Sequence, residues 1–236
     1  PFMSCSAKLP VYALFSAAFF PDHAPLVMIG LYVLGMVVGV LVALVLKRTA
    51  FRGDPVPFVM ELPNYRLPSA KTTLRLAWDK AKGFATKAFT IIFVASVVIW
   101  FLQTFDLRLN VVDDQSASML AALGALLAPV FAPLGFGTWQ ASAALAAGFG
   151  AKENVVATLT VLLGGSTAGL AGLFTPLTAF VFLVFTLLYT PCVAAVSAVR
   201  NELGTKMMWA VIAMQCGVAW VVALVVRLAG MALGLA

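Results

Sequence analysis

The sequence predicts an all-α, polytopic helical membrane protein with broken or re-entrant helices and one cytoplasmic amphipathic helix. Of its 236 residues, 63% are hydrophobic and 10% are charged, and the mean hydropathy is +1.05. A soluble protein of this length does not need so apolar a composition. Several uncharged runs approach the roughly 20 residues that cross a bilayer as a helix. Prolines interrupt some runs, and irregular backbone persists in a bilayer only where protein or a water-filled cavity satisfies it.

Basic residues are concentrated in one predicted loop. Nine of the fifteen Lys and Arg residues lie between Lys47 and Lys87, where only three acidic residues oppose them. A nucleic-acid-binding surface can have this composition, but this patch lies between two predicted spans. Basic loops mark the cytoplasmic side of a membrane protein. We therefore expect a cytoplasmic loop and no nucleic-acid partner.

The N-terminal part contains a short apolar segment and then a full span. Residues 1–20 are few for a span, which suits a truncated helix or the second half of a broken one. Lys8 lies inside this segment; a lysine there faces a cavity or a partner, or its ammonium reaches the interface. Residues 25–46 form an uncharged span in which Gly35 and Gly39 permit close helix packing.

A linker and a basic helix follow this span. Prolines hold residues 52–68 extended. Residues 70–87 carry apolar side chains at helical spacing beneath basic ones, which indicates an amphipathic helix at the cytoplasmic interface. It serves as an anchor or as an element that receives force from a soluble domain. Residues 88–105 form the next span, and the acidic loop after it is external, either ordinarily solvated or concentrating cations.

The middle of the chain contains two interrupted helical segments. Residues 116–128 form a helix too short to span, which suits a re-entrant or surface segment. Residues 138–164 would cross the membrane if Lys152 and Glu153 did not interrupt them. These adjacent side chains point in different directions on a helix and do not simply neutralise each other. Either the helix breaks after its glycines, or the pair faces a polar interior.

The strongest interruption lies in residues 187–202, LLYTPCVAAVSAVRNE. Pro191 lacks an amide donor and breaks or kinks the helix before it. The carbonyls freed at that helix end favour a cation, by their dipoles and by direct ligation. Cys192 adds a soft ligand beside the break, so this stretch is a candidate cation site. Cys216 lies in the last span, 207–228, where a free cysteine behaves as a small hydrophobe.

Five sequence blocks carry a family resemblance: PFMSCSAKLPVYALF, FVMELPNYRLP, FAPLGFGTWQ, GFGAKENVV and YTPCVAAVSAVRNELG. In this order they closely resemble the FeoB ferrous iron transporters of bacteria. The resemblance covers nearly the whole chain and matches the C-terminal part of the FeoB membrane region. The chain opens at Pro1 with neither an initiator Met nor a signal peptide, so we expect a fragment.

The resemblance implies three regions. Residues 1–46 are the end of a first gate segment plus the following transmembrane helix. Residues 47–87 are the basic cytoplasmic linker and amphipathic helix, and residues 88–236 are a transmembrane region with a second gate segment. It also implies a GTPase domain with GTP and Mg²⁺ and an earlier set of helices outside this chain, which has no GxxxxGK[ST] phosphate loop.

The resemblance also assigns candidate site residues. Cys5 and Cys192 match family cysteines proposed to lie on the iron path. Fe²⁺ accepts thiolate and carbonyl ligands, and its binding displaces the thiol proton. We expect the two cysteines to line a shared Fe²⁺ path. The expected gate or polar-path residues are Ser4, Lys152, Glu153 and Pro191.

The expected function is the membrane part of a Fe²⁺ uptake transporter in the bacterial inner membrane, controlled by the GTPase domain. Fe²⁺ is a substrate, and no cofactor is expected in this chain. Expected partners are the bilayer, the GTPase and first-half helices, FeoA and FeoC, and further copies of the protein. The alternatives are a gate-type transporter of nucleosides or another solute, or a structural membrane assembly component. An intramembrane enzyme lacks support, since the chain has no HExxH motif and no membrane-embedded His.

Overall fold

The computed structural model describes residues 2–49, 69–112, 115–163 and 167–234. Within these ranges the chain is helical, and its only pairing of extended backbone is an isolated bridge between Phe105 and Val111. The predicted linker 52–68 lies outside the described residues. The helices are α1 (Leu9–Phe19), α2 (Ala24–Thr49), α3 (Ala70–Thr104), α4 (Met119–Phe131), α5 (Trp139–Gly150), α6 (Asn154–Leu162), α7 (Thr167–Leu173), α8 (Pro176–Leu188) and α9 (Val193–Ala232).

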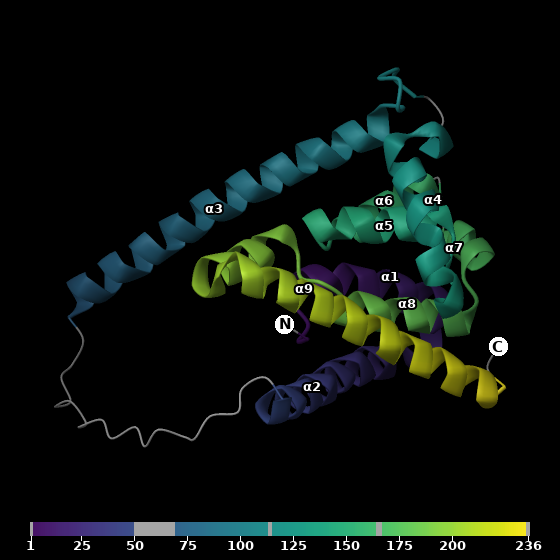
Figure 1. The fold of residues 1–236 in the computed structure, drawn as a ribbon, viewed down its shortest axis with the longest axis horizontal. Coiled ribbons are helices and arrows are strands. Elements are labelled where there is room, and N and C mark those ends of the chain that lie inside the picture. Colours follow the sequence, from purple (N-terminus) through teal and green to yellow (C-terminus); the bar gives the residue numbers. More distant parts are fainter. Residues whose placement is uncertain (1, 50–68, 113–114, 164–166, 235–236) are drawn as a thin grey trace.

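Helix α8 forms the centre of the molecule. It packs against α1, α2 and α9, and Figure 1 shows α9 crossing it obliquely. Phe182 on α8 is fully buried among aromatic rings of other elements, with centroids 5.0 Å from Phe15, 5.3 Å from Phe136 and 5.1 Å from Phe174. A helix that is apolar on all sides is stable only where protein or lipid surrounds it, and here protein surrounds it.

Two helical stretches are long and apolar enough to cross a membrane within the described residues, Pro21–Thr49 and Pro176–Ala232. The first contains the predicted span 25–46. Gly35 lets the Phe2 carbonyl and the Leu187 side chain approach α2 closely, because a Cβ there would lie 2.8 Å from that carbonyl oxygen. The small-residue face therefore packs against the N-terminal segment and α8.

A bent pair of helices provides the re-entrant segment that the sequence predicts. Helices α4 and α5 are inclined by 106° across a short break and together pass as one broken span or a re-entrant loop. Helix α4 continues through Pro129 to Phe131, somewhat beyond the predicted end. The reversal follows at Gly135, whose φ of +89° is a conformation that suits glycine. Gly124 then lets the Trp139 backbone pack against α4.

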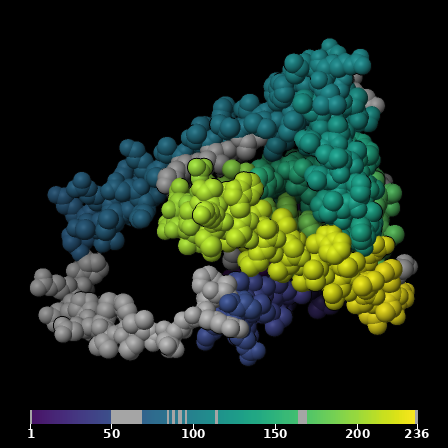
Figure 2. Space-filling model, in the orientation of Figure 1, coloured from purple at the N-terminus to yellow at the C-terminus, as the bar shows by residue number. Residues whose placement is uncertain are grey.

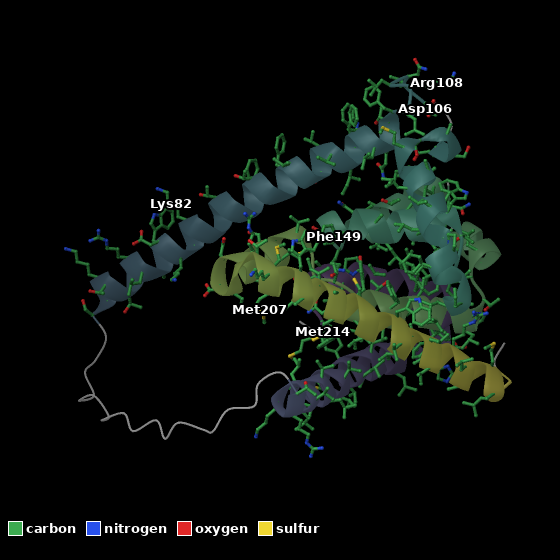
Figure 3. All side chains as sticks on the ribbon, in the orientation of Figure 1. Lys82, Asp106, Arg108, Phe149, Met207 and Met214 are labelled. Carbon is green, nitrogen blue, oxygen red and sulfur yellow. The ribbon has the colours of Figure 1, made fainter. Side chains whose placement is uncertain are left out.

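Helix α3 joins two predicted elements in one. The predicted amphipathic helix 70–87 and the predicted span 88–105 form a continuous helix of 35 residues, with Ser69 before it in extended conformation. No described side chain of α3 is buried. It extends along one side of the molecule and diverges from the other helices towards its N-terminal end (Figures 1 and 2), and Lys82 points away from them (Figure 3).

Candidate functional site

The backbone breaks between α8 and α9, as the sequence predicts. Helix α8 ends at Leu188, where the Tyr189 amide donates to the Phe185 carbonyl, and residues 189–192 are not helical. Pro191 has no amide to continue the ladder, and Cys192 is the N-cap of α9. The last carbonyls of α8 therefore lack helical partners and need other donors.

Lys8 supplies the first of these donors. Its Nζ donates to the Leu187 carbonyl at 2.6 Å, across 179 positions of sequence. The Lys8 side chain is only 4% exposed, since Lys8 is the N-cap of α1, and α1 packs on α8. The structure thus decides between the two interpretations of Lys8: its ammonium binds the broken helix end inside the protein and does not reach an interface.

Lys152 supplies the second donor. The interrupted segment 138–164 breaks into α5 and α6, with residues 151–153 between them. The Lys152 Nζ donates to the Thr190 carbonyl at 2.7 Å and lies 3.1 Å from the centroid of the Tyr189 ring. Its side chain is 2% exposed. The first explanation of the interruption holds, because the helix breaks after its glycines, whereas only Lys152 of the adjacent pair faces inward.

Tyr189 is a site residue that the sequence reasoning missed. Its ring stacks on Phe185 with centroids 5.4 Å apart and carries the Lys152 ammonium on one face. Its hydroxyl donates to the Leu145 carbonyl at 3.3 Å, in the space that Gly148 leaves open. An aromatic residue directly before the Pro191 break was the available signal, since such a ring can bind a cation there.

The structure brings the segments of the two candidate cysteines together around Lys8. The Lys8 amide donates to the Cys5 carbonyl at 3.1 Å, and the Lys8 ammonium binds the Leu187 carbonyl at the break that ends with Cys192. Cys5 is exposed and Cys192 is half-buried. The Lys152 ammonium is close enough to act on the same two thiols and on Lys8. Cys5, Cys192 and the two lysines therefore form one cluster at the end of α8, which we call the break cluster.

The other predicted path residues differ in their surroundings. Ser4 is half-buried, and its Oγ lies 3.2 Å from the hydroxyl of the buried Tyr12, so it is tied to α1. Pro191 is half-buried in the break. Glu153 is exposed whereas Lys152 is buried, so the adjacent pair is split between the interior and the surface. Within the described residues, no group of three or more His, Cys, Asp or Glu is placed to hold a metal ion.

Unpartnered polar side chains lie near the break. Among the described residues, the hydroxyls of Thr186 and Thr190 are buried and have no protein partner, and the same holds for the side-chain amide of Gln215 on α9. Thr190 and Cys216 line a mostly apolar cavity of about 590 Å³ between α4, α5, α8 and α9. Buried polar atoms without partners are uncommon in folded proteins, and no sequence motif points to this group.

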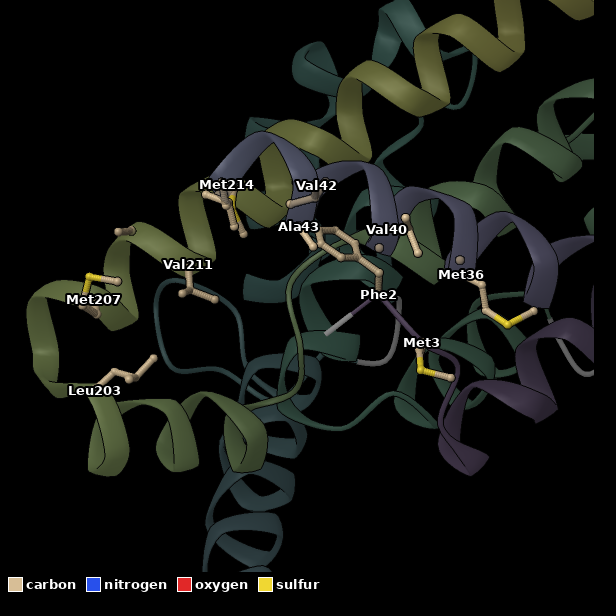
Figure 4. A pocket seen from close by; sticks show the side chains of 14 residues that line it. Phe2, Met3, Met36, Val40, Val42, Ala43, Leu203, Met207, Val211 and Met214 are labelled. Atoms are coloured by element: carbon tan, nitrogen blue, oxygen red, sulfur yellow. The ribbon is translucent and has the colours of Figure 1, made fainter. Parts of the chain in front are cut away.

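A separate apolar groove runs between α2 and α9. It has a volume of about 1010 Å³, and Figure 4 shows Phe2 projecting into it between the two helices. Methionines line it from both sides, among them Met36 on α2 and Met207 and Met214 on α9 (Figure 4). Cys5 and Cys192 do not line this groove, so it is distinct from the break cluster.

Comparisons with known proteins identify the family. The model described as "Ferrous iron transport protein B C terminus" matches residues 28–80, and the Gate model, described as "Nucleoside recognition", matches residues 85–206. The chain belongs to the FeoB family. It consists of the C-terminal and Gate regions of that family and is a membrane protein, as its apolar helices also indicate.

Several FeoB relatives align over most of the chain. The Fe(2+) transporter FeoB of Staphylococcus aureus (strain COL) is 48% identical over 86% of this chain and 31% of its own length. That of Methanocaldococcus jannaschii is 35% identical over 98% of this chain and 36% of its own. The chain therefore spans about a third of these relatives' length. No solved structure matches it.

Proposed function

We propose that this chain is the membrane part of a Fe²⁺ uptake transporter and that it crosses the bacterial inner membrane several times. The observation that carries the proposal is the break cluster, where a broken membrane helix, freed carbonyls and two thiols meet. Transporter sites form at such breaks because irregular backbone there can bind ions. The names of the FeoB relatives support Fe²⁺ as the ion.

In this proposal Cys5 and Cys192 are transient Fe²⁺ ligands on a shared path. Thiolate and carbonyl oxygen both suit Fe²⁺, and each thiol gives up its proton when the metal binds. Two thiols are fewer protein ligands than a storage site uses. A transport site needs such weak binding, because an ion that binds must also leave. Ser4, Pro191, Lys152 and Glu153 are the proposed gate or polar-path residues beside the two cysteines.

The remainder of the transporter supplies control in this proposal. An N-terminal GTPase domain, with GTP and Mg²⁺, and an earlier set of helices act together with this chain, which has no catalytic role of its own. FeoA and FeoC are proposed partners, together with further copies of the protein. A relative from Porphyromonas gingivalis is named "Fe(2+) transport protein A/Fe(2+) transporter FeoB fusion protein". It is 35% identical over 96% of this chain and 33% of its own length. Its name supports FeoA as a partner.

The alternative of a nucleoside transporter rests only on the printed description of the Gate model, "Nucleoside recognition", and the FeoB relatives do not favour it. Liposomes that contain the full-length transporter with this chain separate the two. We expect Fe²⁺ influx under anaerobic conditions and no influx of a labelled nucleoside. Nucleoside influx without Fe²⁺ influx would replace the iron proposal by the second one, and influx of neither would favour a structural component of a membrane assembly.

The cysteine path has a matched control within the chain. Cys192→Ser in the full-length transporter should lower Fe²⁺ uptake at least about tenfold, because a neutral hydroxyl is a poor substitute for a thiolate ligand of this metal. Cys216→Ser should lower uptake less than Cys192→Ser, since Cys216 is exposed on α9 and lines only the cavity beside the break. Equal uptake by both variants at equal expression would remove Cys192 from the path.

A further inference from the structure

The break cluster already contains two cations. The Lys8 and Lys152 ammoniums occupy the Leu187 and Thr190 carbonyls, the groups that a metal ion at the end of α8 would use. Both side chains are almost fully buried. The structure therefore has protein cations at the place where the transported cation is proposed to bind.

These ammoniums lack the usual partners of buried lysines. Within the part of the chain that the structure describes, the ionisable groups that act on them are each other and cysteine thiols, with no carboxylate among them. A buried charge without an opposite charge is costly, and carbonyl dipoles and the Tyr189 ring compensate for it only in part. Two like charges at one helix end also repel each other.

A purely structural cap of α8 would need fewer donors. One donor at the end of a helix satisfies a carbonyl, and a single lysine near the C-terminus is an ordinary donor for it. This chain instead brings two charged donors from separate elements, one before α1 and one from the break between α5 and α6. When both are protonated, they carry two positive charges, which equals the charge of one divalent ion.

We propose that Lys8 and Lys152 are tethered substitutes for the transported ion, which hold the Leu187 and Thr190 carbonyls while no metal is bound and are displaced when one arrives. The inference rests on the proposed function and adds a specificity-determining element to it. A divalent ion that displaces both ammoniums from the carbonyls keeps the number of positive charges there at two. A monovalent ion cannot replace the charge of both, so the arrangement favours divalent cations.

Displacement also links the two broken segments. When the Lys152 ammonium leaves the Thr190 carbonyl, one of the contacts between the α5–α6 break and the α8–α9 break is lost. Release of Lys8 likewise frees the N-terminal segment with Cys5 from α8. Metal arrival would thus loosen both sides of the path, which gives the lysines the role of a gate.

The test removes charge while keeping a hydrogen-bond donor. Lys8→Gln and Lys152→Gln are compared with wild type and with Lys206→Gln, an exposed lysine on α9, in the full-length transporter. We expect each Gln variant of the break cluster to lower the KM for Fe²⁺ in liposomes at least about tenfold, since a unit charge next to a divalent ion is strongly repulsive even at an effective dielectric constant of 20. The Lys206→Gln variant should keep the wild-type KM.

The same variants distinguish a gate from a cap. If the lysines only cap α8, the Gln variants keep the wild-type KM, and Lys8→Met lowers thermal stability without raising metal affinity. Either result, a wild-type KM in both Gln variants or a raised one, overturns the proposal. Should Lys152→Gln not fold, Lys8→Gln alone decides, because it removes one of the two charges.

A binding measurement separates this inference from the proposed function. Purified protein in detergent is heated with and without anaerobic Fe²⁺, and the metal-dependent rise in Tm is compared between wild type and Lys8→Gln. We expect a larger rise in the variant, even if wild-type liposomes take up no Fe²⁺ and the transport proposal fails. An equal or smaller rise in Tm in the variant contradicts the tethered-ion proposal. The transport proposal is then tested separately by the Fe²⁺ uptake assay.

Discussion

Helices α8 and α3 are both largely apolar, yet the structure uses them differently. Ten of the thirteen residues of α8 are buried, and the break cluster forms at its end. Helix α3 is almost three times as long and has no buried side chain among those described. Apolar composition makes a helix suitable for the membrane, and both helices have it. The site forms only at the helix that other elements of the protein surround on all sides. A helix break can form a site where surrounding elements supply donors for its freed carbonyls.

The largest expected effect compares a phenylalanine on each helix. Phe182→Ala on α8 should lower the free energy of unfolding by about 3–5 kcal/mol, because three rings lose their contact and a cavity remains. Phe89→Ala on α3 should change it by less than about 0.5 kcal/mol, as its ring is 74% exposed. Reversible unfolding in mixed micelles measures both. A loss at Phe89 equal to that at Phe182 would mean that α3 belongs to the core.

A smaller effect tests the close approach of α5 to the break. Gly148→Ala should destabilise the protein by about 1–3 kcal/mol, since the new Cβ would collide with the Tyr189 hydroxyl and the Val155 side chain. Gly30→Ala on α2 is the control, because its Cβ would meet no atom within 4 Å. That variant should be neutral or up to about 1 kcal/mol more stable through helix propensity. Thermal unfolding in detergent followed by circular dichroism ranks the two, and the reverse order would refute the packing described here.

The smallest expected effect separates the two contacts of Tyr189. Tyr189→Phe removes the hydrogen bond to the Leu145 carbonyl and should cost about 1 kcal/mol. The ring beneath the Lys152 ammonium remains, so Fe²⁺ uptake should stay near the wild-type value. Tyr189→Leu removes the ring as well and should alter the Fe²⁺ KM in addition to stability. Identical KM values in the two variants would show that the ring does not hold the lysine.

Much of the architecture follows from local sequence patterns. Pro191 ends α8 in the predicted place because it removes a donor wherever it stands. The small residues around Gly148 and Gly150 end α5 before Lys152, and the span 25–46 lies inside α2. The sequence did not indicate that α3 is continuous. Its composition changes from basic to apolar near residue 88, but such a change does not interrupt a helical backbone.

The sequence by itself determined the fold class, the broken helices and the family, because composition, proline positions and long motifs act locally. It also identified Lys8 and Lys152 as charges that need an explanation. Only the tertiary structure decided what they bind. Their acceptors lie 179 and 38 positions away in the chain, and such a contact depends on how α1, the α5–α6 break and α8 pack together. No local pattern encodes that packing, so the tertiary fold alone places two cations at the carbonyls of the broken helix.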